Sequence, residues 1–154
     1  MRKGELLGKV ITFATNAHDG QFDRGGKAYI LHPLAVMYLL NSADEELNCI
    51  AVLHDVVEDT KTSWQDLRDI GCSNRIINAL RALTKIPGQT YDEYKQSVLY
   101  NIDAMMVKKA DLRHNSDIRR LKGITEKDIA RTAKYHAFYL EIEQRLQTFN
   151  EKSS

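Results

Sequence analysis

Helix-breaking residues are scarce in this sequence, and that scarcity limits the folds open to it. The 154 residues include only two prolines, Pro33 and Pro87, and eight glycines. Proline removes a backbone donor and glycine weakens regular structure, so long stretches without either favour long elements. No stretch alternates apolar and polar residues with a period of two, whereas several repeat apolar residues every three or four positions. The sequence therefore predicts an all-α fold.

Apolar periodicity and capping signals locate the expected helices. The signals include residues 42–45, Thr62 or Ser63, and Ser73, each just before an apolar-periodic stretch, while the glycine-rich stretch 19–27 is expected to be a loop. The expected helices, in chain order, cover residues of about 4–18, 34–40, 45–58, 64–70, 73–83, 91–100 and 102–113.

A last helix is predicted after Thr125, because Asp128 stands three positions later as in a capping box. The residues expected to share one face of this helix are Ile129, Ala133, Ala137 and Leu140. We expect the tail from about residue 150 to be frayed. The length and a hydrophobic share of 43% fit one compact domain over residues 1–154, built as a helical bundle.

Charge and composition argue against several classes of function. The 22 basic and 21 acidic residues give a net charge of +1, which offers no electrostatic footprint for a nucleic acid. Apolar runs are only a few residues long, so no membrane partner is expected. The two cysteines form neither a disulfide framework nor a C-x-x-C pair, which predicts a cytoplasmic protein. The oligomeric state is left open.

The stretch 50–60 carries the strongest chemical signal. Four apolar residues lead directly to His54 and Asp55, and Glu58 and Asp59 follow after two valines. On a helix these polar groups would cluster on adjoining faces, since residues four apart are neighbours. Burying them costs several kcal/mol unless a cation or hydrogen bonds compensate. A divalent metal would provide that compensation, and a solvated helix end is the alternative interpretation.

His32 and Asp111 complete a possible ligand set. Taken singly, His32 could be a satisfied structural histidine, and Asp111 a surface residue or an ion-pair partner. Together with His54 and Asp55 they supply two imidazoles and two carboxylates from three predicted helices, an arrangement found in metal sites of helical bundles. Mixed nitrogen and oxygen donors without a thiolate suit manganese, iron or zinc.

The motifs around these residues resemble the RelA/SpoT-type alarmone hydrolases, a group of HD-domain metal-dependent phosphohydrolases. The resemblance covers about residues 5–145 and implies a stand-alone small alarmone hydrolase with a single HD-domain helical bundle. The segments that carry it are residues 17–21, 29–33, 53–60, 83–85 and 107–115.

The resemblance also implies a reaction and the residues that perform it. It implies Mn²⁺, or another divalent transition metal, bound by His32, His54, Asp55 and Asp111. It further implies that Glu58 and Asp59 position and deprotonate the attacking water. The reaction would remove the 3′-pyrophosphate from guanosine tetra- or pentaphosphate and leave GDP or GTP.

The small-molecule nucleotide substrate of that reaction needs contacts beyond the metal. The resemblance implies that Arg24, Lys85, Asn115 and Tyr135 supply them. Asn115 could instead form a helix-end hydrogen bond, and Tyr135 could be a packing residue. Further cations near the motifs, each more often a solvated surface charge, are Lys27, Lys108 and Arg113.

Two positions depart from the pattern of the long enzymes of the family. Asp23 stands where an arginine often lies against the guanine ring, and Ile118 stands where a hydroxyl residue is common. These departures affect recognition of the base and leave the ligand set intact. They keep open a phosphatase acting on another nucleotide, such as the 2′-phosphate of NADPH. A catalytically inactive nucleotide sensor is a further alternative.

Overall fold

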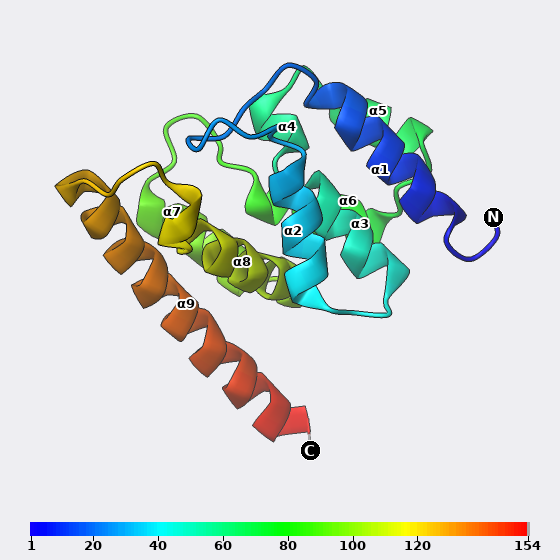
Figure 1. Cartoon of the computed structure of the whole chain (residues 1–154). Helices are drawn as coiled ribbons and strands as arrows, with labels where there is room; N and C mark the ends of the chain where they lie inside the picture. The colour runs from blue at the N-terminus through cyan, green and yellow to red at the C-terminus, as the bar shows by residue number, and fades with distance from the viewer. Residues whose placement is uncertain (154) are drawn as a thin grey trace.

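Helices form every regular element of residues 1–153, which are the residues that the computed structural model describes (Figure 1). Within this range an isolated bridge between Phe22 and Ala28 is the one β-type pairing, so the all-α prediction is confirmed. The elements are α1 (Glu5–Ala17), α2 (Leu31–Leu40), α3 (Glu45–Leu53), α4 (Val56–Asp59), α5 (Trp64–Asp69), α6 (Asn74–Leu83), α7 (Tyr91–Leu99), α8 (Ile102–Asn115), η1 (Ile118–Arg120) and α9 (Glu126–Ser153).

Short polar side chains begin several helices where the sequence predicted caps. Asp44 accepts a hydrogen bond from the backbone N–H of Leu47 at the start of α3. Ser63, rather than Thr62, forms a reciprocal capping box at the start of α5. Ser73 caps α6 with a single hydrogen bond, which its hydroxyl oxygen accepts from the backbone N–H of Ile76. These caps satisfy backbone donors that would otherwise have no partner in the first turn.

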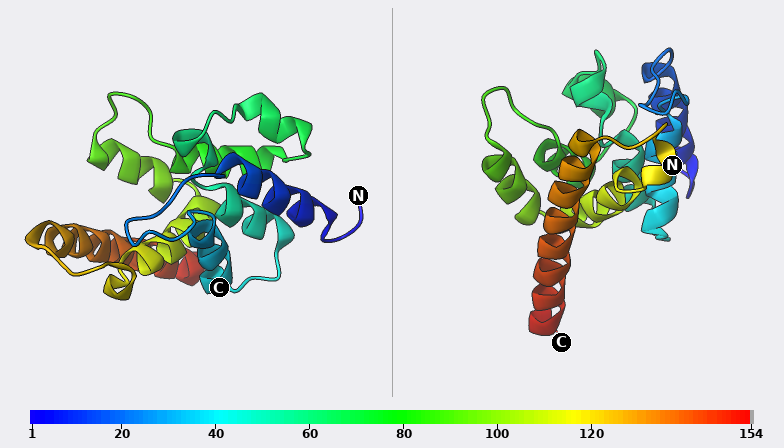
Figure 2. Two further views of the ribbon diagram at one scale, coloured as in Figure 1. Left: turned by 45° about the horizontal axis from the view of Figure 1, so that its top comes forward. Right: turned by 60° about the vertical axis from the view of Figure 1, so that its left-hand side comes forward.

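Helix α3 lies at the centre of the fold. It packs against α1, α2, α6 and α8, and those four helices surround it in the views of Figure 2. Its side chains are apolar on nearly every face, as expected for a helix that is covered on all sides. The buried residues of α3 are Leu47, Cys49, Ile50, Ala51, Val52 and Leu53. The central helix thus delivers its C-terminal end, with His54, into the interior.

The predicted single helix over residues 45–58 is wrong. Helix α3 ends at Leu53 and α4 begins at Val56, so His54 and Asp55 form a break between them. Consecutive side chains of an α-helix point about 100° apart. The break lets the His54 imidazole and the Asp55 carboxylate turn toward each other, 3.0 Å apart between Nε2 and Oδ2.

The four residues predicted to share a face of the last helix lie on its solvent-exposed side. Ile129 is 60% exposed and Leu140 is 50% exposed, and the two alanines predicted between them are exposed as well. The buried residues of α9 are Phe138 and Ile142, which face α7 and α8. Aromatic side chains bury more apolar area than alanines, which favours the face that carries Phe138.

Helix α9 is the longest element and lies along one side of the molecule, with its C-terminal part extending past the other helices (Figure 1). The helix continues to Ser153, through the tail that was expected to fray from about residue 150. Fraying itself stays a prediction, and residue 154 lies outside the described residues. Within the described residues, no helix combines the length and the apolar character that crossing a membrane requires.

Two alanine substitutions on α9 compare how much its buried face and its exposed face contribute to stability. Phe138→Ala is expected to lower the free energy of unfolding by about 3–5 kcal/mol, because it leaves a cavity at a side chain that is 1% exposed. Leu140→Ala, on the exposed face of the same helix, is expected to change it by less than about 0.5 kcal/mol. Urea unfolding measures both. Equal losses for the two variants would contradict the packing described for α9.

Candidate metal centre and adjoining cavity

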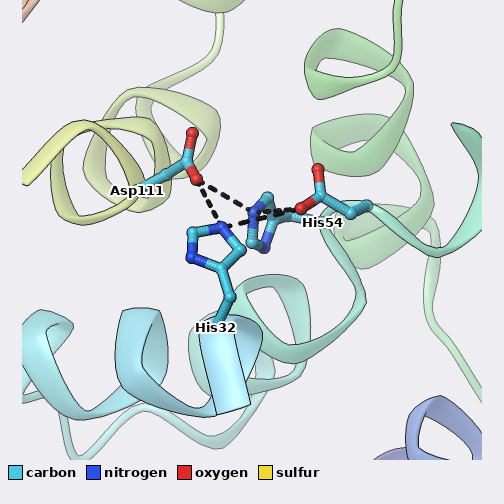
Figure 3. A group of neighbouring side chains, drawn as sticks. His32, His54 and Asp111 are labelled. Atoms are coloured by element: carbon cyan, nitrogen blue, oxygen red, sulfur yellow. Dashed lines mark hydrogen bonds and ion pairs between the residues drawn. The ribbon is translucent and has the colours of Figure 1, made fainter. Parts of the chain in front are cut away.

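Four side chains from separate parts of the chain meet at one buried point. His32 lies in the first turn of α2, His54 and Asp55 lie in the break after α3, and Asp111 lies in α8. One donor atom from each residue can be chosen so that all four atoms lie within 4.8 Å of one another. Figure 3 shows His32, His54 and Asp111 pointing toward one another. The structure thus brings together the four residues predicted as metal ligands.

The distances within this cluster are those of donors facing a shared centre. His32 Nε2 lies 2.9 Å from Asp111 Oδ1 and 3.6 Å from Asp55 Oδ2. His54 Nε2 lies 3.2 Å from the same oxygen of Asp111. His32, His54 and Asp111 are buried, whereas Asp55 is partly accessible. The cluster therefore has one side open to a ligand or to water.

Hydrogen bonds behind the cluster orient both imidazoles. His54 Nδ1 lies 2.7 Å from the carbonyl oxygen of Ala51, which can only accept, so Nδ1 carries a proton. A neutral His54 then presents the Nε2 lone pair to the centre. His32 Nδ1 lies 2.7 Å from Nδ1 of His114, whose ring stacks on that of His32. Partners of this kind fix the tautomer of metal-binding histidines.

The carboxylates of the cluster are held in the ionised form. Burial alone would raise the pKa of Asp111, but Lys108, His54 and His32 lower it well below its usual range. Burial would likewise raise the pKa of Asp55, and its interaction with His54 brings it down to about 2. The Lys108 ammonium donates to Asp111 Oδ2 at 2.9 Å. Both acids are therefore charged at neutral pH.

The donor set fits a divalent transition metal. Neutral imidazoles would direct their Nε2 lone pairs at charged carboxylate oxygens, which is repulsive unless a positive charge lies between them. The proximity of Asp55 and Asp111 raises the pKa of His54 well above its usual value, although burial opposes the change. The cluster thus favours a cation, and the described His32, His54, Asp55 and Asp111 could bind a metal ion.

His114 is expected to support metal binding through His32. Replacing His114 with phenylalanine removes the partner of His32 Nδ1 and should weaken metal binding by about 10- to 100-fold. His114→Asn retains an acceptor near the same place and should restore much of the affinity. Titration calorimetry with Mn²⁺ measures both, and His136→Phe on the exposed side of α9 is the matched control. Wild-type affinity in His114→Phe would contradict this role.

Glu58 and Asp59 lie on α4, immediately after the cluster. Both residues have a large solvent-accessible fraction, although part of each side chain is covered by the protein. Partial burial and the charge of Asp55 raise the pKa of each carboxyl, which makes it a stronger base than a free side chain. The Gln21 amide donates to the backbone oxygen of Asp59 at 2.8 Å, so residues 17–21 anchor the end of α4. The structure places the predicted water-activating pair beside the predicted ligands.

A cavity of about 270 Å³ adjoins the cluster through His32. Three of the predicted substrate contacts, Arg24, Asn115 and Tyr135, contribute to its lining, which consists of Phe22, Asp23, Arg24, Gly25, Tyr29, His32, Asn115, Asp117, Arg120, Leu121, Arg131, Thr132 and Tyr135. Two of these residues link the cavity to the cluster. His32 belongs to both, and Asn115 Nδ2 donates to Asp111 Oδ1 at 3.1 Å. The cavity and the cluster therefore form one continuous site.

Lys85, the fourth predicted substrate contact, does not contribute to that lining. Its ammonium lies 5.3 Å from the centre of the Tyr94 ring, and its backbone hydrogen-bonds the Glu58 carboxylate. Lys108, a further candidate cation, is buried against Asp111. These two lysines contact Glu58 and Asp111, two acids of the predicted site.

Several residues of the site had no role assigned from the sequence. The Tyr29 hydroxyl donates to Asp55 Oδ2 at 2.5 Å, and its place in the motif 29–33 was the available signal. His114 lies inside the motif 107–115 but was not singled out. Arg120 and Arg131 line the cavity from η1 and α9, beyond any motif that the sequence offered.

Asp23 organises the loop 19–27 against η1. Its Oδ1 accepts from the backbone N–H of Lys27 at 2.9 Å, and its Oδ2 accepts from Arg120 at 3.4 Å. The backbone of Gly25 lies so close to the carbonyl oxygen of Arg120 that a Cβ atom at position 25 would clash. Asp23 thus joins two distant segments into one wall of the cavity.

The fold and the site define a helical domain with a buried cluster of two histidines and two aspartates beside a cavity. A structure of a metazoan ortholog of SpoT that hydrolyses ppGpp has the same fold, with a TM-score of 0.74, 20% identity, and coverage of 100% of this chain and 98% of that one. No protein-family model matches the chain.

The resemblance to RelA/SpoT-type alarmone hydrolases is confirmed by curated relatives. A guanosine-3′,5′-bis(diphosphate) 3′-pyrophosphohydrolase of Haemophilus influenzae is 33% identical over 114 residues, which is 66% of this chain. The bifunctional (p)ppGpp synthase/hydrolase SpoT of Escherichia coli is 29% identical over 122 residues, or 71% of the chain. The chain spans 17% of the length of each of these two proteins.

Proposed function

We propose that this protein is an HD-domain hydrolase that removes the 3′-pyrophosphate from guanosine tetra- or pentaphosphate. The observation that carries the proposal is the convergence of His32, His54, Asp55 and Asp111 beside a cavity that Arg24, Arg120 and Arg131 line. Relatives named as pyrophosphohydrolases support the reaction, although they are much longer. Residues 1–154 would form a single domain. Its substrate would be a small-molecule nucleotide.

The proposed cofactor is Mn²⁺, with other divalent transition metals as alternatives, held by those four residues. An ion bound there would supply Lewis acidity toward the phosphate and lower the pKa of a water. The carboxylate of Glu58 is suited to take the proton of the attacking water, because its pKa is raised and α4 directly follows Asp55. Asp59, next to it, would help to orient that water.

The cavity residues would hold the nucleotide while the 3′-pyrophosphate lies at the cluster. Arg24 offers an exposed guanidinium for phosphate oxygens, and Asn115 reaches both the cavity and Asp111. Tyr135 contributes a partly buried ring to the same wall. Lys85, beside Glu58, would act near the leaving group rather than in the cavity. A cytoplasmic location is part of the proposal, supported by two cysteines that are both unpaired.

Purified protein incubated with ppGpp and Mn²⁺ tests the reaction. We expect release of pyrophosphate together with GDP, loss of the reaction in EDTA, and recovery when Mn²⁺ is added back. Parallel assays with Mg²⁺, Zn²⁺ and Fe²⁺ identify the preferred metal. Absence of pyrophosphate under all of these conditions would reject the proposal.

A second candidate function is a phosphatase acting on NADPH, and the observation that favours it is Asp23 in place of the usual arginine. Both reactions would use the same ligands and differ in what occupies the cavity. Release of phosphate from NADPH, with no pyrophosphate from ppGpp, would select this candidate. Nucleotide binding without product in either assay would indicate the inactive sensor instead.

A further inference from the structure

Arg120 is the most firmly held cation in the wall of the cavity. Its Nη1 donates to the backbone oxygen of His114 at 3.0 Å and to Asn115 Oδ1 at 3.1 Å. Its Nη2 donates to Asp23 Oδ2 at 3.4 Å, across 97 positions of sequence. The side chain is 22% exposed. Arg120 is thus fixed between the loop 19–27 and the end of α8, and it retains access to the cavity.

These contacts leave part of the guanidinium available. Arginine has five N–H groups, and the three hydrogen bonds of Arg120 use both protons of Nη1 and one of Nη2. Among the side chains of residues 1–152, no hydrogen bond occupies Nε–H or the second proton of Nη2. Neighbouring N–H groups of this kind bind two acceptors that lie side by side, on a carboxylate, a phosphate or a base edge.

The charge of Asp23 indicates which of these ligands Arg120 suits. Burial would raise the pKa of Asp23, but hydrogen bonds from Lys27 and Arg120 lower it, so the acid is ionised beside the guanidinium. The ion pair is close to neutral and has little excess attraction for a phosphate. Arg24, which lines the same cavity and is exposed, lacks such a partner among the described residues. The base edge is therefore the better match for Arg120.

We propose that Arg120 is a specificity-determining residue, which Asp23 holds in place so that its free N–H groups bind N7 and O6 of a guanine base. The inference rests on the proposed function, since it assigns the base of the nucleotide in that cavity. Guanine presents two acceptors on this edge, whereas adenine presents one acceptor and an amino group. An arginine facing adenine would place one of its N–H donors against the adenine amino group, which is also a donor. The arrangement therefore selects against adenine nucleotides.

Direct binding of GDP and ADP tests the inference without turnover. Titration calorimetry in the presence of Mn²⁺ should show that the wild-type protein binds GDP roughly tenfold or more tightly than ADP. Arg120→Met should lose that preference by weakening GDP binding, with ADP binding changed little. Arg120→Lys retains the charge but not the paired donors, so it should also lose the preference.

Two further variants separate base recognition from general effects. Arg119→Met, at the neighbouring and largely exposed position, should leave the preference unchanged. Arg24→Met should weaken GDP and ADP binding equally, because a phosphate contact does not distinguish the bases. Circular dichroism and thermal unfolding establish that the Arg120 variants are folded. If Arg120→Lys keeps the wild-type preference, or if the wild type binds ADP as tightly as GDP, the inference is overturned.

The two proposals fail in different ways. A protein that prefers GDP through Arg120 but releases no pyrophosphate from ppGpp retains the inference and loses the proposed reaction. A protein that hydrolyses ppGpp with the same KM in the wild type and in Arg120→Lys retains the reaction and loses the inference.

Discussion

Replacing His54 with alanine is expected to abolish metal binding and to lower the rate of pyrophosphate release from ppGpp by more than about a thousandfold. The imidazole is buried and faces both Asp55 and Asp111, so no nearby side chain can take its place. Loss of the metal would remove both the activation of water and the stabilisation of charge on the phosphate. Metal content by mass spectrometry and a pyrophosphate assay measure the two effects.

His136→Ala is the matched control for this experiment. His136 is an exposed histidine on α9, and its replacement should change neither metal content nor rate. Thermal unfolding of both variants distinguishes loss of the site from loss of the fold. A His54→Ala protein that still binds one equivalent of Mn²⁺ and turns over would remove the basis of the metal-centre assignment.

Glu58→Gln is expected to separate chemistry from metal binding. The substitution preserves the size of the side chain and removes the basic carboxylate, so hydrolysis should slow by about two to four orders of magnitude while Mn²⁺ affinity stays near the wild-type value. The rate should be measured at saturating Mn²⁺ and ppGpp, so that the change reports on the catalytic step.

The raised pKa of Glu58 adds a pH signature to the same experiment. As the pH falls through the pKa of Glu58, its carboxylate becomes protonated and can no longer act as a base. Wild-type activity should therefore decline at acidic pH, and the Glu58→Gln variant should lack that decline. Glu126→Gln, in the exposed first turn of α9, is the matched control. Full activity in Glu58→Gln would show that another group takes the proton.

Local signals in the sequence predicted much of the fold. Caps such as Ser63 and Ser73 act within one turn, so a few neighbouring residues are enough to recognise them. Motifs located the four candidate ligands for a similar reason, because each motif combines an apolar stretch with a polar residue at its end. The break at His54 and Asp55 was not predicted, because the apolar spacing of residues 45–58 continues through it and no proline or glycine marks it.

The buried face of α9 and the contacts of Arg120 could not be predicted from the sequence. Two apolar stripes run along α9, one through Leu140 and one through Phe138, and periodicity alone does not say which of them packs on α7 and α8. Arg120 pairs with Asp23, which lies 97 positions earlier in the sequence, and neither residue lies in a pattern that predicts the other. Tertiary contacts decide both features, and a single sequence does not contain them explicitly.

Gly25 ties the width of the cavity to a single position that lies outside the metal-ligand cluster. Its backbone can approach the carbonyl oxygen of Arg120 because no side chain intervenes. Any larger residue there would push the loop and η1 apart and widen the cavity, while His54 and Asp111 would stay where the central helices hold them. One substitution at position 25 would therefore change the shape of the cavity and leave the geometry of the buried cluster as it is.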